Sequence, residues 1–346
     1  MHFLFALPNM AGNVPPILEI ARRLVSRGHS IRVLASSSLR DSVESRGCEY
    51  VPFRQGPDID VTLSEPWKEE GISDIAWMVE NMIVGPGLRF AQDVLDELKA
   101  YPADAVVVDH VIPGALLGAE ATQTPCAFLL HTIYHCPAPG LPTYGMGFLP
   151  PTTWMGRARD AFLRELMFRL ARKSLSKVNE VRAELKLGPL KDIWEVYDKA
   201  NRVLVMTAQA FDFKAMELPA NVCYVGPQLE PANPGGWDSP WLSSDHRPLV
   251  LVGLSSSAQG QEPLLRKLVG ALGEMEVRAL VTTGPAIETD RFDAPANVVI
   301  RSFVSHADVM PESALVITHA GHGTVIRALA AGVPLVCIPL GRDQYD

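Results

Sequence analysis

The 346-residue chain has few cysteines, and they are not arranged as disulfide or metal motifs. Its five cysteines are an odd number, lie far apart in the sequence, and form no Cys-x-x-Cys pair and no Cys/His cluster with zinc spacing. This pattern argues against a disulfide framework and against a structural zinc module. A reducing cytoplasm is therefore the simplest compartment to expect.

Long hydrophobic runs are also missing. The longest, from Ala328 to Gly341, is interrupted by a glycine and two prolines. It falls short of the roughly 20 apolar residues that a bilayer-spanning helix needs. The first residues, MHFLFAL, carry no basic leader and are typical of a first strand rather than of a signal peptide.

An excess of positive charge is absent as well. The chain has 31 Lys and Arg against 39 Asp and Glu, a formal net charge of −8. Nucleic-acid affinity comes largely from cations that neutralise phosphates, so a nucleic-acid partner is not expected. An apolar fraction of 47% indicates a globular protein, and the length allows about two domains.

What the chain does contain is a regular alternation of strand-like and helix-like segments. Residues 2–7 read as a buried strand, and residues 15–27 as a helix with apolar side chains on one face, ended by Gly28. Further strands are predicted at 31–35, 103–108, 126–130, 201–207, 249–254, 277–282, 297–300, 314–318 and 335–338. Such alternation predicts an α/β fold with doubly wound parallel sheets.

Two irregular segments divide this alternation. Residues 226–247 hold four prolines and three glycines without periodicity, which predicts a linker between a domain at 1–225 and a domain at 248–346. Residues 131–156 are rich in proline, glycine and aromatic side chains, which predicts a binding loop. A basic helix is expected over 157–186; it is compatible with an anionic membrane surface or with a solvated face.

The most informative motif is T-H-A-G-H-G-T, which starts at Thr318 and joins a buried strand to a helix. Gly321 and Gly323 let the backbone approach an anion, the helix N-terminus offers N–H groups without intrahelical partners, and Thr324 adds a hydroxyl. His319 could donate to the same anion. The turn is thus a candidate phosphate site, although an ordinary capped turn would have the same local pattern.

This motif belongs to a longer pattern. F-V-S-H-A-D-V-M-P precedes it from Phe303, and A-G-V-P-L-V-C-I-P-L-G-R-D-Q follows it and ends at Gln344. The pattern resembles the donor-sugar signature of the UDP-glycosyltransferase superfamily, including bacterial macrolide and antibiotic glycosyltransferases. The resemblance implies a GT-B fold: two Rossmann-like domains facing a cleft, the first binding the acceptor and the second the nucleotide sugar. It also implies a second domain that is incomplete at Asp346.

The resemblance assigns donor-binding roles by position. Phe303 stands where the family stacks an aromatic ring on the base, with Val304 and His306 beside it. The diphosphate would contact Ser255, Ser256, His319, Gly321, His322, Gly323 and Thr324, and the sugar Asp343 and Gln344. Arg327 replaces a glutamate that bonds the ribose in plant members, so the choice between UDP and dTDP stays open.

The same resemblance places the acceptor chemistry in the first half. Asn13, after Gly12, occupies the position of the family's catalytic histidine, and an amide cannot accept a proton at neutral pH. Asp109 matches the aspartate of the family's His-Asp pair. Either Asp109 takes the proton itself, or one of His110, His131 and His135 replaces the missing base. The acceptor-binding residues expected are Gly12, Asn13, His131, Tyr134, Tyr144 and Phe148.

Together these features predict an inverting, metal-independent glycosyltransferase without a cofactor. It would move a sugar from a nucleoside diphosphate to a hydroxyl of a small hydrophobic acceptor: a natural product, phenolic, sterol or lipid. The alternative is a catalytically impaired nucleotide-sugar-binding or auxiliary protein of the same fold, which the Asn13 substitution keeps open. The oligomeric state is left open.

Overall fold

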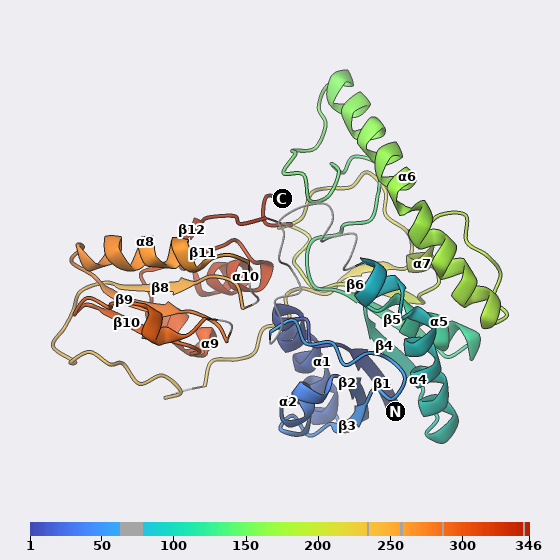
Figure 1. Cartoon of the computed structure of the whole chain (residues 1–346), viewed down its shortest axis with the longest axis horizontal. Helices are drawn as coiled ribbons and strands as arrows, with labels where there is room; N and C mark the ends of the chain where they lie inside the picture. Colours follow the sequence, from blue (N-terminus) through green and yellow to red (C-terminus); the bar gives the residue numbers. More distant parts are fainter. Residues whose placement is uncertain (63–78, 234, 257–258, 286, 342) are drawn as a thin grey trace. The chain divides into compact units, whose positions relative to one another are not determined.

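The computed structural model describes residues 1–62, 79–233, 235–256, 259–285, 287–341 and 343–346 (Figure 1). These residues form two compact units. The N-terminal unit comprises 1–60, 79–144 and 148–228, and the C-terminal unit comprises 229–346 together with 61–62 and Gly145–Gly147. The change between them falls after Gln228, inside the predicted linker; the exact ends of the predicted domains stay predictions.

The N-terminal unit is built on a parallel sheet of seven described strands in the order β3-β2-β1-β4-β5-β6-β7. The strands are β1 (His2–Leu7), β2 (Ser30–Ala35), β3 (Glu49–Pro52), β4 (Ala105–Asp109), β5 (Cys126–Leu130), β6 (Arg202–Val205) and β7 (Val222–Tyr224). The central strands are buried on both faces, which explains why they read as continuous apolar runs rather than as alternating patterns.

Helices cover this sheet on both sides. They are α1 (Val14–Ser26), α2 (Arg40–Glu44), α4 (Gly87–Ala100), α5 (Pro113–Ala121), α6 (Trp154–Glu184) and α7 (Glu195–Asp198), with short turns η1 (Ala11–Asn13), η2 (Ser37–Leu39) and the π-helical η3 (Val79–Val84). On one face, Ile17 and Leu18 of α1 pack with Phe5 and Leu7 of β1. The expected glycine cap is confirmed, because Gly28 adopts a φ of +83° just after α1.

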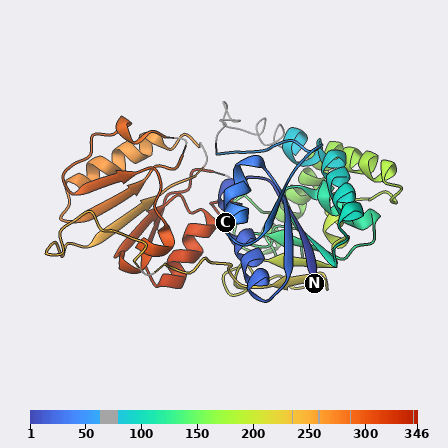
Figure 2. The same ribbon diagram turned by 90° about the horizontal axis from the view of Figure 1, so that it is seen from below.

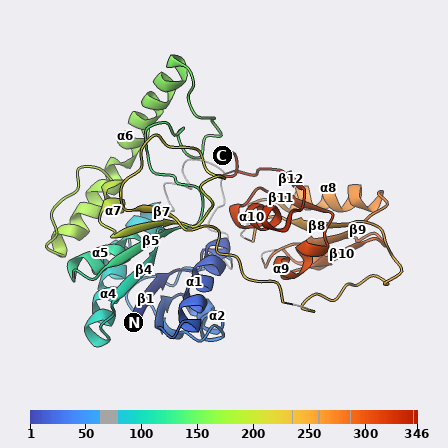
Figure 3. The same cartoon turned by 180° about the vertical axis from the view of Figure 1, so that it is seen from behind.

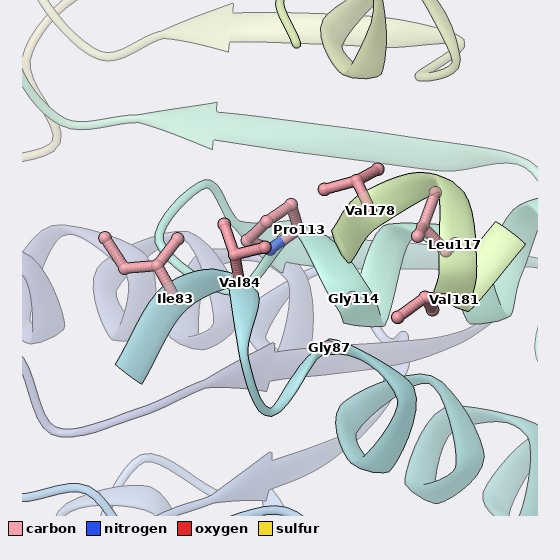
Figure 4. Close-up of a pocket in the computed structure, with 8 residues that line it drawn as sticks. All are labelled: Ile83, Val84, Gly87, Pro113, Gly114, Leu117, Val178 and Val181. Carbon is pink, nitrogen blue, oxygen red and sulfur yellow. The ribbon is translucent and has the colours of Figure 1, made fainter. Parts of the chain in front are cut away.

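Helices α4 and α5 pack unusually closely because glycines face each other at their crossing. A Cβ atom on Gly114 would lie 2.2 Å from the carbonyl oxygen of Gly87, and one on Gly118 would lie 2.6 Å from that of Ala91. Beside this crossing is a small apolar hollow lined by η3, α4, α5 and α6, including Ile83 and Val178 (Figure 4). Substitution of either glycine would force the helices apart.

The C-terminal unit repeats the design with a parallel sheet of five described strands in the order β10-β9-β8-β11-β12. Its strands are β8 (Leu249–Gly253), β9 (Arg278–Thr282), β10 (Val298–Arg301), β11 (Leu315–Thr318) and β12 (Leu335–Cys337). Its helices are α8 (Glu262–Gly273), α9 (His306–Val309) and α10 (His322–Ala331), with turns η4 (Thr289–Arg291) and η5 (Met310–Glu312).

Two apolar cores flank this second sheet. Val250 and Val252 of β8 pack with residues of α8, whereas Leu249 and Leu251 pack with residues of α9 and α10. In the ribbon, α8 lies on one side of this sheet and α9 and α10 lie on the other (Figure 2). Trp237 and Trp241, from the proline-rich segment before β8, pack against the second core. The irregular segment is therefore held on the C-terminal unit by its own tryptophans.

The predicted fold class, two α/β units with parallel sheets, is confirmed. Helix α6 begins at Trp154 rather than at residue 157, because the Thr153 hydroxyl oxygen accepts a hydrogen bond from the Gly156 N–H at 3.1 Å and caps the first turn. Across the described ranges, none of the helices combines the length and apolar character needed to cross a bilayer.

Candidate active site

In each sheet the strand order reverses between two neighbouring strands, and the predicted site residues follow those strands. In the N-terminal unit, the chain runs outward from β1 through β2 and from β4 through β5. In the C-terminal unit, β8 and β11 have the same relation. Ligands of open α/β sheets bind at such switch points, beyond the carboxyl ends of the strands. We call the two places the β1/β4 corner and the β8/β11 corner.

A buried carboxylate dominates the β1/β4 corner. Asp109 is the last residue of β4 and is 1% exposed. Its Oδ1 lies 3.1 Å from Nε2 of His131 and 3.4 Å from Nδ1 of His110, and it accepts a hydrogen bond of 3.1 Å from the Val111 N–H. His131 reaches it because β5 pairs with β4, and Leu129 of β5 lies opposite Asp109. His131 follows two residues after Leu129, so both strands deliver their side chains to one edge of the sheet.

Electrostatics favour a charged Asp109 beside a neutral His110. Burial opposes ionisation of Asp109, but His131 and His110 outweigh it and hold the pKa of Asp109 below its ordinary value. For His110 burial is the stronger influence, and it lowers the pKa although Asp109 pulls the other way. His110 is thus neutral at pH 7, and a neutral imidazole can accept a proton.

A row of rings extends from this cluster. The His110 ring centroid lies 4.7 Å from that of His131 and 5.0 Å from that of His135. Nε2 of His135 is 2.8 Å from the Tyr197 hydroxyl, and its ring is 5.2 Å from that of Tyr144. Burial holds the pKa of His135 well below its ordinary value. His135 therefore belongs to a second contact set, one ring removed from Asp109.

Asn13 lies at the other half of the corner, where α1 begins after β1. Its backbone is the N-cap of α1, yet among the described residues its side chain makes no capping hydrogen bond. Gly12 is exposed, and Ala11 has a φ of +53°, a left-handed conformation that is rare for a residue with a Cβ. The loop is thus held in a strained form at the predicted acceptor position.

The loop from His131 to Thr153 contains neither helix nor strand, as the sequence predicts. The Tyr134 N–H donates to Asp212 at 2.7 Å, and the Tyr134 side chain is buried. Tyr144 is half-buried beside His135, while Phe148 lies under the guanidinium of Arg159 at 4.0 Å. Of the predicted acceptor-binding residues, His131 and Tyr144 lie in one row of rings, joined through His110 and His135, whereas the side chain of Tyr134 is buried.

The β8/β11 corner has a different make-up. The T-H-A-G-H-G-T turn leaves β11 and enters α10, with Gly321 as the helix N-cap and Ala320 at a φ of +67°. A Cβ on Gly321 would lie 2.6 Å from the His319 ring, so only glycine leaves room for that ring. Gly323 is exposed in the first helical turn, next to the half-buried His322 and Thr324. Backbone amides, imidazole and hydroxyl thus surround one helix N-terminus.

Ser255 joins this corner from β8 through a chain of amides. Gln259 Nε2 donates to the Ser255 hydroxyl at 2.5 Å, and Gln344 Nε2 donates to Gln259 Oε1 at 3.0 Å. Gln344 Oε1 accepts from the N–H groups of Leu340 and Gly341. Ser256 is exposed, and Asp343 is half-buried next to Gln344. The predicted diphosphate and sugar residues are therefore linked by Gln259.

Phe303 and His306 form the outer part of the corner. The Phe303 ring is 80% exposed, which is unusual for a large aromatic side chain, while Val304 packs against the core. The Thr282 hydroxyl donates to the Val252 carbonyl, so it must accept from His306 Nε2 at 3.1 Å. Burial lowers the pKa of His306 to about 4. His306 is thus a neutral imidazole whose Nδ1 is the acceptor.

The Asp109 cluster also has the donor set of a metal site. Asp109, His110 and His131 each offer one ligand atom, and these atoms lie within 4.8 Å of one another. A carboxylate with two imidazoles suits a transition metal as well as a proton relay. The effect of a chelator on activity distinguishes these two uses.

Sequence reasoning missed two residues of these corners, Gln259 and Thr282. Both act on predicted site residues: Gln259 bridges Ser255 and Gln344, and Thr282 sets the tautomer of His306. Thr282 could have been identified from the sequence, because it ends β9, a strand that neighbours β8. Gln259 had none, since it lies in a loop without a motif.

Comparison with known proteins gives a consistent result. Residues 249–346 match the family described as glycosyltransferase family 28 C-terminal domain. The chain is 28% identical over 348 residues to 4'-demethylrebeccamycin synthase of Lentzea aerocolonigenes, covering 97% of this chain and 82% of that protein. It is 22% identical over 353 residues to zeaxanthin glucosyltransferase of Pantoea ananas, covering 99% and 80%.

Solved structures show the same fold. The glycotransferase of kitacinnamycin matches with a TM-score of 0.75 and 19% identity, covering 99% of this chain and 81% of that one. The calicheamicin glycosyltransferase CalG4 matches with a TM-score of 0.72 and 21% identity, covering 97% and 79%. The fold, with its two parallel-sheet α/β units, is therefore that of GT-B proteins.

Proposed function

We propose that the chain is a GT-B glycosyltransferase of the UDP-glycosyltransferase superfamily, because it resembles such proteins in sequence and in fold. It transfers a sugar from a nucleoside diphosphate to a hydroxyl of a small hydrophobic acceptor, with inversion at the anomeric carbon and without a metal ion. The observation that carries this proposal is the buried Asp109 carboxylate in contact with two imidazoles at the end of β4.

His110 is the proposed base. Its side chain is 17% exposed, whereas that of Asp109 is fully buried and that of His131 is 5% exposed. A base must reach the proton that it removes, which favours His110. Asp109 then orients the ring and stabilises the imidazolium that forms. His110 would thus take the role of the catalytic histidine whose position is occupied by Asn13 in this chain.

The reaction is a single displacement. The acceptor oxygen forms a bond to the anomeric carbon as the bond from that carbon to the diphosphate breaks, and the acceptor proton passes to His110. Charge develops on the departing diphosphate. The amides at the start of α10, with His319 and Thr324, are the proposed donors to that charge, a task that fixed dipoles perform without a metal.

Donor selection rests on the outer part of the β8/β11 corner. Phe303 offers an exposed face for stacking on a base, and His306 Nδ1 can accept from an imide N–H of uracil or thymine. The Arg327 guanidinium donates to the Glu230 carbonyl at 3.0 Å and has no acceptor atom for a ribose hydroxyl. We therefore include both UDP-sugars and dTDP-sugars as donors.

The acceptor is proposed to be an aromatic or otherwise hydrophobic natural product. The relatives 4'-demethylrebeccamycin synthase and zeaxanthin glucosyltransferase point to that class by their names. The loop from His131 to Thr153 supplies aromatic rings, among them Tyr144 and Phe148. Because burial lowers the pKa of His110, the base is weak, which favours a phenol with a pKa near 10 over an aliphatic alcohol.

The test is a transfer assay with UDP-glucose and dTDP-glucose against a panel of phenolic and alcohol acceptors. Products are identified by mass spectrometry, and NMR reports the anomeric configuration. We expect transfer to phenols with a β-linked product from an α-linked donor. A retained configuration would contradict the single displacement.

The second candidate is a protein that binds nucleotide sugars without transferring them, because Asn13 removes the usual base. Asn13→His separates the two functions. If the chain binds donor by calorimetry, turns over no acceptor, and gains no activity with Asn13→His, the binding function is correct and the transferase proposal fails.

A further inference from the structure

The N-terminal half of α6 carries an exposed stripe of apolar side chains. Met155, Phe162, Leu166 and Leu170 are 64%, 68%, 41% and 60% exposed. Spacings of seven, four and four residues place them on one face of the helix. We call these four residues the α6 stripe. Trp154, 72% exposed, stands at the start of the same helix.

The two halves of α6 are anchored very differently. In the C-terminal half, Val178 and Val181 are buried, and Arg182 forms two hydrogen bonds with the Glu120 carboxylate, of 2.6 and 3.0 Å. The N-terminal half extends beyond the sheet of its own unit in both views (Figures 1 and 3). The stripe is therefore not part of the core of the N-terminal unit.

The same half of the helix is strongly basic. Between residues 154 and 173 there are six cationic side chains against Asp160 and Glu165, on a chain whose net charge is −8. The cations are Arg157, Arg159, Arg164, Arg169, Arg172 and Lys173. Positive charge is thus concentrated where apolar side chains are exposed, which is the composition of a helix that lies in a membrane interface.

We propose that this half of α6 docks on an anionic lipid surface, with the stripe in the acyl boundary and the cations at the lipid phosphates. A second copy of the chain is a poorer occupant. A two-fold interface on this face would bring two cationic helices together, and like charges in contact are unfavourable. Arg159, Arg169 and Lys173 form ion pairs with Asp160, Glu165 and Glu80. The other three cations form no ion pair among the described residues, and a neutral apolar partner would leave them without an anion.

Docking would bring the loop from His131 to Thr153, which is proposed to bind the acceptor, to the lipid surface. That loop ends at Thr153, directly before α6, and Arg159 of the helix covers the Phe148 ring at 4.0 Å. The consequence is access to acceptors that partition into lipid. The docking itself does not depend on which reaction the chain performs, so it can be tested without a substrate.

The test is co-sedimentation of the full chain with two kinds of vesicle. One is made of equal parts phosphatidylglycerol and phosphatidylcholine, and the other of phosphatidylcholine alone. We expect binding to the first that weakens as salt rises, because the attraction to anionic headgroups is screened. Failure to bind the anionic vesicles at low salt would overturn the proposal.

Variants separate the apolar and the ionic contributions. Phe162→Ser with Leu166→Ser should lower the partition coefficient about tenfold or more, because two large apolar groups no longer insert. Arg164→Gln with Arg172→Gln should also lower it about tenfold or more. The control is Leu242→Ser, which removes an apolar side chain that is 78% exposed on the C-terminal unit and should change nothing.

Two measurements keep the result unambiguous. Circular dichroism and thermal melting show that each variant is folded, since all five positions are on the surface. Light scattering reports the oligomeric state. If vesicle binding is the same for all variants, or if the chain is a dimer that Phe162→Ser converts to a monomer, the lipid proposal is wrong.

Discussion

The β1/β4 corner and the β8/β11 corner have the same topology and opposite chemistry. In the first, Asp109 and two imidazoles form a cluster in which the carboxylate is buried. In the second, glycines, amides and hydroxyls gather at the start of α10. Strand order determines where a ligand can bind. The side chains at the strand ends determine whether that site suits proton transfer or anion binding.

Both corners contain one alanine in a left-handed conformation: Ala11 before α1 and Ala320 before α10. Such a conformation costs a residue with a Cβ roughly 1–2 kcal/mol. The strain occurs in the corresponding loop of each unit, although the two loops have unrelated side chains. Strained loops at both strand ends fit the general finding that such backbone clusters at functional sites.

The largest effect is expected at the β1/β4 corner, where proton transfer is proposed to occur. His110→Ala should lower kcat about 10²–10⁴-fold by removing the base, with the donor KM unchanged. Steady-state kinetics with a phenolic acceptor measure it. His246→Ala, at an exposed position, is the matched control. A larger loss in His131→Ala than in His110→Ala would assign the base to His131 instead.

The next largest effect is expected at the β8/β11 corner, where the diphosphate is proposed to bind. His319→Ala should raise the donor KM about tenfold to a hundredfold, because a hydrogen bond to a charged group contributes roughly 1.5–3 kcal/mol. Calorimetry with UDP alone measures the same loss without the sugar. Undiminished donor use would remove His319 from the proposed diphosphate site.

Base stacking is tested by a pair of substitutions at one position. Phe303→Ala should weaken donor binding about tenfold, since stacking contributes roughly 1–3 kcal/mol, whereas Phe303→Trp should preserve it. Titration with UDP and with dTDP gives both values. Equal affinity in the alanine and tryptophan variants would show that the exposed ring has another purpose.

A smaller effect is expected in the pH dependence. Protonated His110 cannot accept a proton, so kcat/KM should fall toward acid pH. Because burial lowers the pKa of His110 from its ordinary 6.5, that fall should lie below pH 6.5. In Asp109→Asn the carboxylate no longer raises this pKa, so an NMR titration of the His110 ring should move to still lower pH. A move upward would contradict the assigned pairing.

The last prediction is that removal of metal ions has no effect on activity. Prolonged treatment with EDTA should leave kcat unchanged if Asp109, His110 and His131 act as a proton relay. Loss of activity that zinc or another divalent ion restores would show that the same three residues hold a metal. That result would also remove the contrast between the two corners.

Much of the fold was accessible from the sequence because buried parallel strands are uninterrupted apolar runs. The bounds of β1 and β5 match the predictions of 2–7 and 126–130. Helix α5, PGALLGAEA, gave no periodic signal, since it is buried on nearly all sides. The edge strands β3 and β7 are short and were not predicted.

The site was accessible only in part. The position of Asp109 at a strand end could be read from its apolar run, but its distance to His131 depends on the pairing of β4 with β5. The contacts of Gln259 depend on loop conformation, which no local pattern encodes. Residue types at strand ends were therefore predictable, and their hydrogen-bond partners were not.

Gln344 has a consequence for how a donor sugar would meet the C-terminal unit. One N–H of its side-chain amide donates to Gln259, which in turn donates to Ser255. The same amide carries a second N–H, so a sugar hydroxyl could accept from Gln344 while the bond to Gln259 is kept. The hexose would therefore meet a side chain that is already held in position, and none of these hydrogen bonds would have to break.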